Sequence, residues 1–309
     1  MTKVAAILCA DIHLSEYPPV ARSVEPDWLA AQGRCLDQLR NLATNNDNVP
    51  IIAAGDIFDR WNSSAAIINW AIDHLPPMWA IHGQHDLPMH NNEDLKRSAY
   101  WTLVKAGTIK PLGKSESLLQ LPPRNIRMNG FPWGVELEHP NGTDVSIHVA
   151  VVHSFLWIKD RCYIGAPIEQ NLTQYQDRLR GYDVAVFGDN HQSFLAKCNN
   201  TIVFNCGCLI PRKSNERFAK PSVGVLYADG SVKQQFLDTS EDKWIEESHS
   251  VVMAMEDQQE MIKFVEGLRS VNSEWVDFKS AVIRYLEDHS VVPGVKKLIL
   301  KVMEDCNGS

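Results

Sequence analysis

The sequence predicts an α/β (α+β) protein in which two mixed β-sheets stack as a sandwich flanked by helices. Two observations lead to this fold class. Strand-like and helix-like segments alternate over the first hundred residues, and further strand-like runs continue to residue 236. After Asp238 the apolar residues recur at helical spacing instead. This order predicts a two-layered domain over residues 1–238 and a small helical module over residues 239–309.

The spacing of apolar residues predicts the strands and helices in the first half of the domain. Three short apolar runs without a helical face predict the buried strands Val4–Cys9, Val49–Ala54 and Met78–Ile81. Stretches with an apolar stripe at helical spacing predict the helices Asp27–Leu42, Ser64–Leu75 and Ser98–Lys105. The alternation of the two kinds of element is typical of strand–helix–strand units.

The second half reads as strands. Between Ile109 and Gly134, proline and glycine break the chain into short runs, which indicates antiparallel strands. Apolar runs then predict strands at Val145–Val152, Ala185–Phe187, Thr201–Asn205 and Val223–Ala228. An Asp-Gly pair at 229–230 predicts a hairpin turn into a last strand, Ser231–Phe236.

Composition excludes several classes of protein. The chain has 309 residues, of which 44% are hydrophobic and 22% charged, as expected of a globular protein with a sizeable core. No run approaches the roughly 18 apolar residues that a membrane-spanning helix needs, so no membrane association is expected. The seven cysteines include no CxxC pair, which favours scattered thiols in a reducing cytoplasm over a zinc ribbon or disulfides.

The net charge of −8 is unevenly distributed. Residues 237–309 carry 15 acids and 8 bases, whereas residues 1–236 are almost neutral. A protein that coats nucleic acid by charge alone is therefore excluded, but a local positive groove in the first domain is not.

Five polar motifs each follow a predicted strand. They are Asp11-Ile12-His13, Gly55–Arg60, Gly83–Asp86, His153-Ser154 and Gly188–His191. Each motif alone is more often an ordinary turn or a structural histidine. Because strand ends converge at one edge of a stacked sheet, the five together predict one cluster. Carboxylate, amide and imidazole donors without thiolates suit Mn, Mg, Fe or Zn ions.

The order of these motifs resembles that of the calcineurin-like metallophosphoesterases, over roughly Val4 to Asp238. Within that superfamily, Gly55–Asp59, Gly83–Asp86 and Asn205–Leu209 look most like the SbcD-type DNA repair nucleases, including phage-encoded relatives. The resemblance implies the calcineurin-like phosphoesterase fold and a metal-dependent exonuclease or endonuclease acting on DNA in repair or recombination. It also implies a homodimer, an SMC-like ABC ATPase partner, and a C-terminal module that caps the substrate or docks that partner.

The resemblance also implies two divalent metal ions, Mn²⁺ in preference to Mg²⁺. Asp56 would bridge the two metals. The other ligands would be Asp11, His13 and His191 for one metal, and Gln84, His153 and Asp189 for the second.

Three further residues take roles from the resemblance. His85 would stabilise the charge that develops on the phosphate or protonate the leaving oxygen. Asp59 would fix the orientation of His85, and Arg60 would contact the phosphate.

Gln84 and Asp189 depart from the family pattern, which usually has Asn and His at these positions. Both positions still offer a donor atom, so we interpret the second metal site as retuned. An anionic oxygen in place of a neutral nitrogen favours Mn²⁺ or Mg²⁺ over Zn²⁺. The same changes motivate an alternative in which the chain is a metal-poor binding scaffold. The other alternative is a phosphomonoesterase or small-nucleotide phosphodiesterase, and Arg60 supports it.

Two clusters of basic residues are candidates for contact with nucleic acid. The first holds Arg212, Lys213 and Arg217 and follows the predicted strand Thr201–Asn205. The second combines an aromatic ring with bases, as single-stranded nucleic acid prefers, in Trp157, Lys159 and Arg161. A solvated loop explains the first cluster equally well and explains the second better than contact with nucleic acid does.

Overall fold

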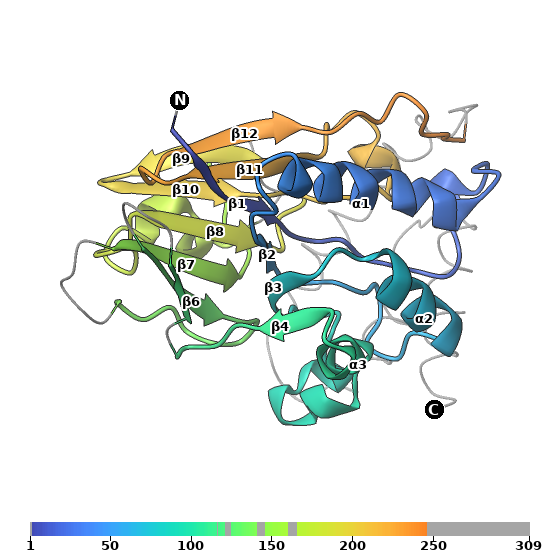
Figure 1. The fold of residues 1–309 in the computed structure, drawn as a ribbon, viewed down its shortest axis with the longest axis horizontal. Helices are drawn as coiled ribbons and strands as arrows, with labels where there is room; N and C mark the ends of the chain where they lie inside the picture. The colour runs from blue at the N-terminus through green and yellow to red at the C-terminus, as the bar shows by residue number, and fades with distance from the viewer. Residues whose placement is uncertain (1, 116, 121–124, 141–145, 160–165, 246–309) are drawn as a thin grey trace, which may run out of the picture. The chain divides into compact units, whose positions relative to one another are not determined.

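The first of two six-stranded sheets carries most of the helices. The computed structural model describes residues 2–115, 117–120, 125–140, 146–159 and 166–245. Its first sheet has the strand order β12-β11-β1-β2-β3-β4 (Figure 1). These strands are β1 (Val4–Cys9), β2 (Ile51–Ala54), β3 (Met78–Ile81), β4 (Ile109–Pro111), β11 (Ser222–Tyr227) and β12 (Val232–Phe236).

The second sheet has the order β5-β6-β7-β8-β10-β9. Its strands are β5 (Ser117–Leu119), β6 (Ile126–Phe131), β7 (Ile147–His153), β8 (Val184–Gly188), β9 (Phe194–Cys198) and β10 (Thr201–Asn205). Both sheets mix parallel and antiparallel pairs, which confirms the predicted two-layered mixed sandwich.

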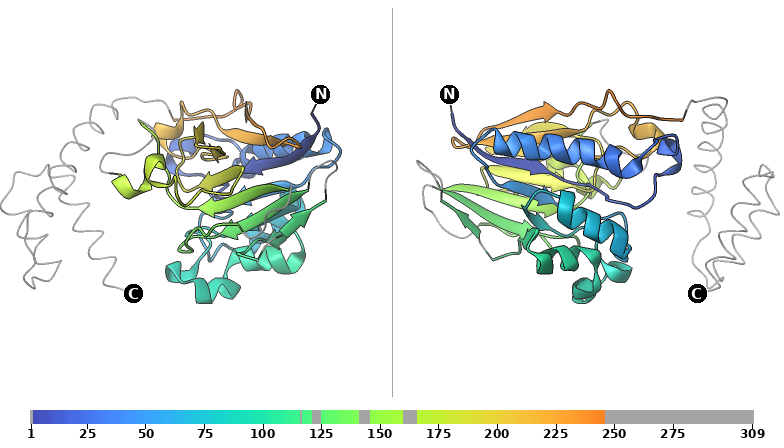
Figure 2. Two further views of the ribbon diagram at one scale, coloured as in Figure 1. Left: turned by 90° about the vertical axis from the view of Figure 1, so that its left-hand side faces the viewer. Right: turned by 45° about the vertical axis from the view of Figure 1, so that its right-hand side comes forward.

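The helices pack on the first sheet. They are α1 (Trp28–Thr44), α2 (Ala65–His74) and α3 (Ala99–Ala106). Each begins at a side chain that accepts a backbone N–H of the first turn, namely Asp27, Ser64 and Ser98. Their buried faces share one apolar cluster with the first sheet, on the face turned away from the second sheet (Figure 2). No helix among the described residues is long and apolar enough to cross a membrane.

Six short 3₁₀ segments complete the described structure. They are η1 (Val20–Arg22), η2 (Pro88–His90), η3 (Asn92–Arg97), η4 (Ile168–Gln170), η5 (Leu172–Gln174) and η6 (Ser214–Glu216).

The main core lies between the two sheets. Leu8 and Ile52 of the first sheet pack there with Val149, Val186 and Phe204 of the second, and all five are fully buried. Alternate residues of β1 and β2 face the helices instead, because successive side chains in a strand point to opposite faces. With both faces covered, the strands are apolar throughout, which is why they read as continuous apolar runs in the sequence.

Strand directions between Ile109 and Gly134 differ from the prediction. Only β5 and β6 pair antiparallel there. β4 runs parallel to β3 in the first sheet, and β6 runs parallel to β7 in the second. The helix α3 between β3 and β4 carries the chain back to its starting edge, so the two strands share a direction. The strand β9, which pairs antiparallel with β10, was not predicted from the sequence.

The chain divides into two units, Met1–Ile245 and Glu246–Ser309. The second unit lies outside the described residues, so a helical module there stays a prediction. The last residues of the first unit are held to its body by Arg22, which is fully buried. The Arg22 guanidinium lies 2.5 Å from a carboxylate oxygen of Glu25 and 3.0 Å from one of Asp242. The backbone N–H of Ile245 also donates to the carbonyl of Ala21.

Candidate metal centre

The five polar motifs meet at the carboxyl ends of β1, β2, β3, β7 and β8. The first three strands are parallel neighbours in the first sheet, and β7 and β8 are parallel neighbours in the second. Contacts between the sheets close the cluster: His153 ends β7, and its Nδ1 lies 2.6 Å from the carbonyl oxygen of Ala54 at the end of β2. The topology therefore brings together residues that lie up to 180 positions apart in the sequence.

The backbone at this edge adopts conformations that L-residues rarely take. Asp11, His13, Asp56 and Asp189 all have positive φ, between 50° and 81°. Such strain typically collects at functional sites, where it aims side chains inward. Gly83 has no room for a side chain, because a Cβ there would lie 2.1 Å from Oδ1 of Asp56.

Donor atoms converge at the centre of the site. His13 Nε2 lies 3.2 Å from His191 Nε2 and 4.0 Å from Asp11 Oδ1. Asp56 Oδ2 lies 3.7 Å from His13 Nε2 on one side and 3.4 Å from His153 Nε2 on the other. These contacts include three sets of donor atoms that lie within 4.8 Å of one another, Asp11–His13–His191, His13–Asp56–His85 and Asp11–Asp56–His153. Asp56 is shared by the last two sets, so it would be the ligand common to two neighbouring cations.

Gln84 and Asp189 lie beside the second set. Gln84 Oε1 is 2.7 Å from His153 Nε2, and its amide nitrogen donates to Asp189 Oδ1 at 2.7 Å. The backbone N–H of Asp189 donates to the Asp11 carboxylate. All seven predicted ligands are thus in one cluster. The Asp189 carboxylate meets the amide of Gln84 and belongs to none of the compact donor sets among the described residues.

The donor set fits divalent cations. His153 donates its Nδ1–H to a carbonyl, and His191 places Nδ1 2.7 Å from Glu216, so the lone pairs on both Nε2 atoms face inward. The Nε2 of His153 lies 2.7 Å from the Gln84 carbonyl oxygen, so positive charge must lie between these two atoms, either as a proton on Nε2 or as a bound cation. Asp56 Oδ2 is buried without a hydrogen-bond partner, which also calls for a cation.

The electrostatics of the cluster are those of a site that takes up positive charge. Burial raises the pKa of Asp11 to about 7. Burial opposes ionisation of Asp56 too, but His153 holds its pKa below the usual range. The reverse holds for His153, because Asp56 outweighs burial and raises its pKa to about 10. Burial, helped by the neighbouring His191, keeps the pKa of His13 well below its usual value, although Asp56 opposes the shift.

Glu216 is a functional residue that the sequence analysis missed. Its carboxylate accepts from His191 Nδ1 at 2.7 Å and from the backbone N–H groups of Arg212 and Lys213. Burial opposes its ionisation, but the hydrogen bond from His191 lowers the pKa of Glu216 to about 2. A buried carboxylate behind a metal-binding histidine fixes the tautomer and raises the basicity of the ligand. In the sequence Glu216 is one acid within a basic run, which gives no signal for this role.

Asp86 was noted only as the end of a motif. It is fully buried and accepts the N–H groups of Ile57, Phe58 and Gly83 at 3.0 to 3.2 Å. These three bonds tie the loop after β2 to the loop after β3. Asp86 therefore holds Asp56 and Gln84 in register.

His85 lies at the exposed side of the cluster. Its ring centroid is 4.8 Å from that of His13, and its backbone N–H donates to Asp56 Oδ1. Asp59 does contact His85, but through its main-chain carbonyl, 2.7 Å from Nδ1. The Asp59 carboxylate is held by Arg212 at 2.5 Å instead. The Nε2 atom of His85 remains available to a substrate.

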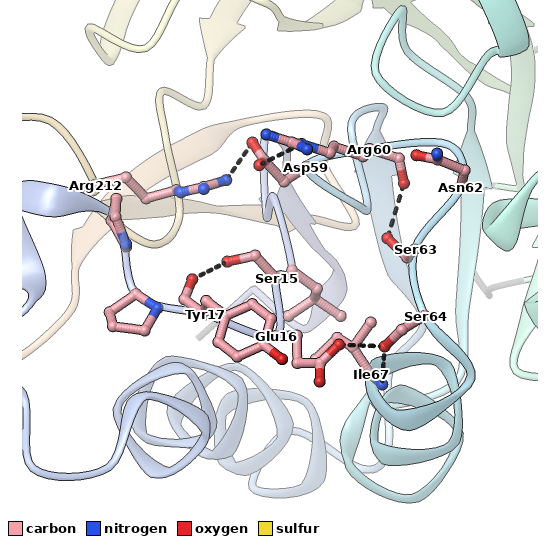
Figure 3. A pocket seen from close by; sticks show the side chains of 13 residues that line it. Ser15, Glu16, Tyr17, Asp59, Arg60, Asn62, Ser63, Ser64, Ile67 and Arg212 are labelled. Atoms are coloured by element: carbon pink, nitrogen blue, oxygen red, sulfur yellow. Dashed lines mark hydrogen bonds and ion pairs between the residues drawn. The ribbon is translucent and has the colours of Figure 1, made fainter.

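Arg60 lines a neighbouring pocket of about 400 Å³ (Figure 3). Asp59 lies between Arg212 on one side and Arg60 on the other, and Ser15, Tyr17 and Ser64 line the same pocket. The Arg60 side chain is 81% exposed and only 4.0 Å from Asp59 Oδ2. The structure therefore does not bring Arg60 into the pocket of His85 and His191, where a phosphate contact was expected.

The pocket at the cluster itself has a volume of about 590 Å³. It is lined by Gln84, His85, Asp189 and His191 and by residues of the segment Lys213–Ala219. The cluster is thus open to a substrate at one side, and its other sides are buried.

The residues predicted to contact nucleic acid fall into separate places. Arg212 is nearly buried on Asp59 and on the carbonyl of His13, so it orders the site. Lys213 is exposed and lines the 590 Å³ pocket. Arg217 donates to the carbonyl of Ile245.

The second basic cluster divides in the same way. Trp157 is half-buried and donates from its indole N–H to Pro167, and Lys159 is exposed. Arg161 lies outside the described residues.

Comparisons with solved structures return distant likenesses. The chain is 10% identical to the sulfate thiohydrolase SoxB of Thermus thermophilus, covering 79% of this chain and 58% of that one, with a TM-score of 0.48. An archaeal phosphodiesterase is 13% identical, over 75% of this chain and 99% of that one, with a TM-score of 0.38. The NAD nucleotidase of Haemophilus influenzae is 13% identical, over 92% and 60%, with a TM-score of 0.42.

No curated protein matches the sequence significantly. The profile of the calcineurin-like phosphoesterases, however, matches residues 6–193, which is more than half of the chain and includes all the predicted metal ligands. Together with the two mixed sheets, this match establishes that the chain belongs to the calcineurin-like phosphoesterase family.

Proposed function

We propose that this protein is a dimetal-dependent phosphodiesterase that cleaves DNA, as the SbcD-type nucleases do. The observation that carries the dimetal proposal is the position of Asp56. Its Oδ2 atom lies between imidazole nitrogens of two donor sets and has no hydrogen-bond partner. Divalent cations held by such sets would stabilise negative charge on a phosphoryl group and supply a water of lowered pKa.

The protein's own residues supply orientation and proton transfer. His85 is held by the Asp59 carbonyl at Nδ1 and by its own backbone bond to Asp56, so its Nε2 has a fixed position at the open side of the cluster. A histidine placed there can donate a hydrogen bond or a proton to the oxygen of the leaving group. Lys213 at the rim adds a positive charge for the phosphate backbone of DNA.

A small-nucleotide phosphodiesterase is the second candidate. The pocket volume of about 590 Å³ lies within the range of small-molecule sites, which favours this alternative over a phosphomonoesterase that relies on Arg60. The scaffold alternative is disfavoured, because all seven predicted ligand positions hold donor groups in one cluster.

An assay of metal-free protein supplemented with Mn²⁺, Mg²⁺ or neither tests the proposal. The substrates are linear duplex DNA, single-stranded DNA, bis-p-nitrophenyl phosphate and p-nitrophenyl phosphate. We expect Mn²⁺-dependent cleavage of DNA and of the diester. Asp56→Asn or His85→Ala should lower it by at least ~100-fold. Hydrolysis of the monoester alone would refute the diesterase proposal, and full activity of His85→Ala would refute the role of His85.

A further inference from the structure

The pocket at the metal centre is also lined by residues that are not predicted ligands. They are Phe155, Gln192 and, from the segment Lys213–Ala219, Lys213, Asn215, Glu216, Phe218 and Ala219. Besides the Glu216 carboxylate, which is bonded to His191, this part of the lining offers aromatic rings, amides and one lysine. Its composition differs from that of a site for an isolated phosphate, which needs only cations and hydrogen-bond donors.

Phe218 is the most exposed aromatic ring at this pocket. Its side chain is 79% exposed, although full burial of a phenylalanine is worth about 1.5–3 kcal/mol. A single exposed apolar residue is ordinary on a protein surface. Here, however, the ring lines the mouth of the pocket that also contains His85 and His191. The Arg217 guanidinium lies 5.7 Å from the centroid of the ring, which adds positive charge beside it.

The turn that carries Phe218 is fixed to the metal centre. Glu216, two residues earlier, accepts from His191 and from two backbone N–H groups. The N–H of Ala219, the residue after Phe218, donates to the carbonyl of Glu216. The ring is therefore presented from a short turn that is tied at Glu216 to the ligand His191.

Phe155 is fixed from the other sheet. It follows His153, the last residue of β7, by two positions, and it is half-buried in the same pocket. Gln192 and Asn215 line the pocket as well and offer amide donors and acceptors. Aromatic faces with amides around them suit a flat heterocycle with hydrogen-bonding edges.

We infer that this pocket binds an unpaired nucleobase attached to the phosphate that is cleaved, with Phe218 as its stacking surface. The inference rests on the proposed function and deepens it by naming the substrate class. A base can stack on Phe218 only if the face of the base is not already covered by a neighbouring base in a duplex. The protein is then selective for single-stranded, frayed or flipped nucleotides over paired ones, with Lys213 beside the attached phosphate.

Oligothymidylate and a matched oligonucleotide with abasic residues at the cleaved end test the inference. The two substrates share the phosphate backbone and differ only in the base. Wild-type protein should cleave the base-bearing strand about tenfold more efficiently by kcat/KM, the size of one stacking contact. Phe218→Ala should reduce this preference to near one, and Phe218→Trp should keep it. Phe236→Ala is the matched control, because Phe236 is also exposed (55%) but lies on β12 and outside the pocket.

A binding measurement makes the result independent of turnover. In the His85→Ala background with Mn²⁺, fluorescence anisotropy should show tighter binding of the base-bearing strand. The added Phe218→Ala substitution should remove the difference. Competition by thymidine monophosphate separates a site for a mononucleotide from one that needs a strand. Equal affinity for both oligonucleotides, or none below about 0.1 mM, would overturn the inference.

Failure of the proposed function gives a different pattern. If no diester is hydrolysed with any metal, the proposed diesterase is refuted, whereas the binding preference still decides the role of Phe218. If bis-p-nitrophenyl phosphate is hydrolysed but abasic and base-bearing strands are cleaved equally, the diesterase stands and the nucleobase site is refuted.

Discussion

Replacement of Glu216 by glutamine tests whether this buried carboxylate sets the metal-binding form of His191. In the native site one carboxylate oxygen accepts from His191 Nδ1, and the other accepts the N–H groups of Arg212 and Lys213. Glutamine has only one acceptor oxygen. It keeps two hydrogen bonds if that oxygen stays with the backbone and the amide NH₂ turns toward His191.

In that arrangement the Nδ1 of His191 must accept a hydrogen bond, so its proton moves to Nε2. A protonated Nε2 cannot bind a metal ion, and the charge that supports the ligand is lost as well. We therefore expect Glu216→Gln to weaken one Mn²⁺ site by about 10- to 100-fold, or ~1.4–2.8 kcal/mol. Because both backbone bonds survive, the fold should persist.

Calorimetric titration of Mn²⁺ into metal-free protein measures this effect. Glu169→Gln is a suitable control, because Glu169 is exposed on η4 and lines none of the pockets described above. In a His191→Ala background the Glu216→Gln substitution should have little further effect, since its action passes through that histidine. Equal Mn²⁺ affinity in Glu216→Gln and wild type would refute the reasoning.

The stability of the metal-free protein gives a second check. Because the folded pKa of Glu216 lies at about 2, below its ordinary 4.5, its interactions are fully present above pH 4.5 and are lost as the pH falls toward 2. The stability difference between wild type and Glu216→Gln should therefore shrink over that range in thermal unfolding. A difference that stays constant from pH 6 to pH 3 would contradict the assigned pKa.

Four other predictions concern Asp86, His153, Asp189 and the oligomeric state. Asp86→Ala leaves three buried N–H groups without an acceptor, so thermal unfolding should show a loss of at least ~3 kcal/mol, and a loss under 1 kcal/mol would contradict this role. The Mn²⁺ dissociation constant should fall by up to about tenfold per pH unit between pH 6 and 9 for each proton displaced, because the pKa of His153 is raised to about 10; a pH-independent constant would show that no proton is displaced. Asp189→His should shift the rising limb of the pH–rate profile to lower pH under saturating Mn²⁺, since a neutral ligand leaves more positive charge on the metals; an unchanged limb would show that Asp189 is not a ligand. Light scattering should report a homodimer at micromolar concentration, as the resemblance to the SbcD-type nucleases implies, and a monomer would refute that expectation.

The cluster of candidate ligands could be predicted from the sequence because these residues come from strand ends. Asp11, Asp56 and His153 each stand within two residues of a buried strand, and parallel strands carry such residues to one edge whatever the details of packing. Motif spacing therefore fixed the membership of the cluster. It could not predict the hydrogen bond from the Gln84 amide to the Asp189 carboxylate, because that contact depends on how two loops pack.

The roles of Glu216, Arg212 and Phe218 could not be predicted in this way. All three lie in one loop after β10 whose sequence shows only a run of charges with one aromatic ring. The orientations of two of these side chains are decided by residues that follow other strands. Glu216 contacts His191, and Arg212 pairs with Asp59. Phe218 is placed by the turn that Glu216 anchors.

The sequence by itself determined the two-layered fold class, most of its strands, the helices and the residue types at the candidate metal centre, because the spacing of apolar residues and the motifs at strand ends are local properties. Tertiary structure decided the direction of β4 and the contact of the Glu216 carboxylate with His191. It also decided the ion pair between Arg212 and Asp59, which leaves Arg212 unavailable to nucleic acid, and the position of the exposed Phe218 ring at the pocket. These features depend on contacts between segments far apart in the chain, and the energy of such a contact exists only once the two sheets have stacked.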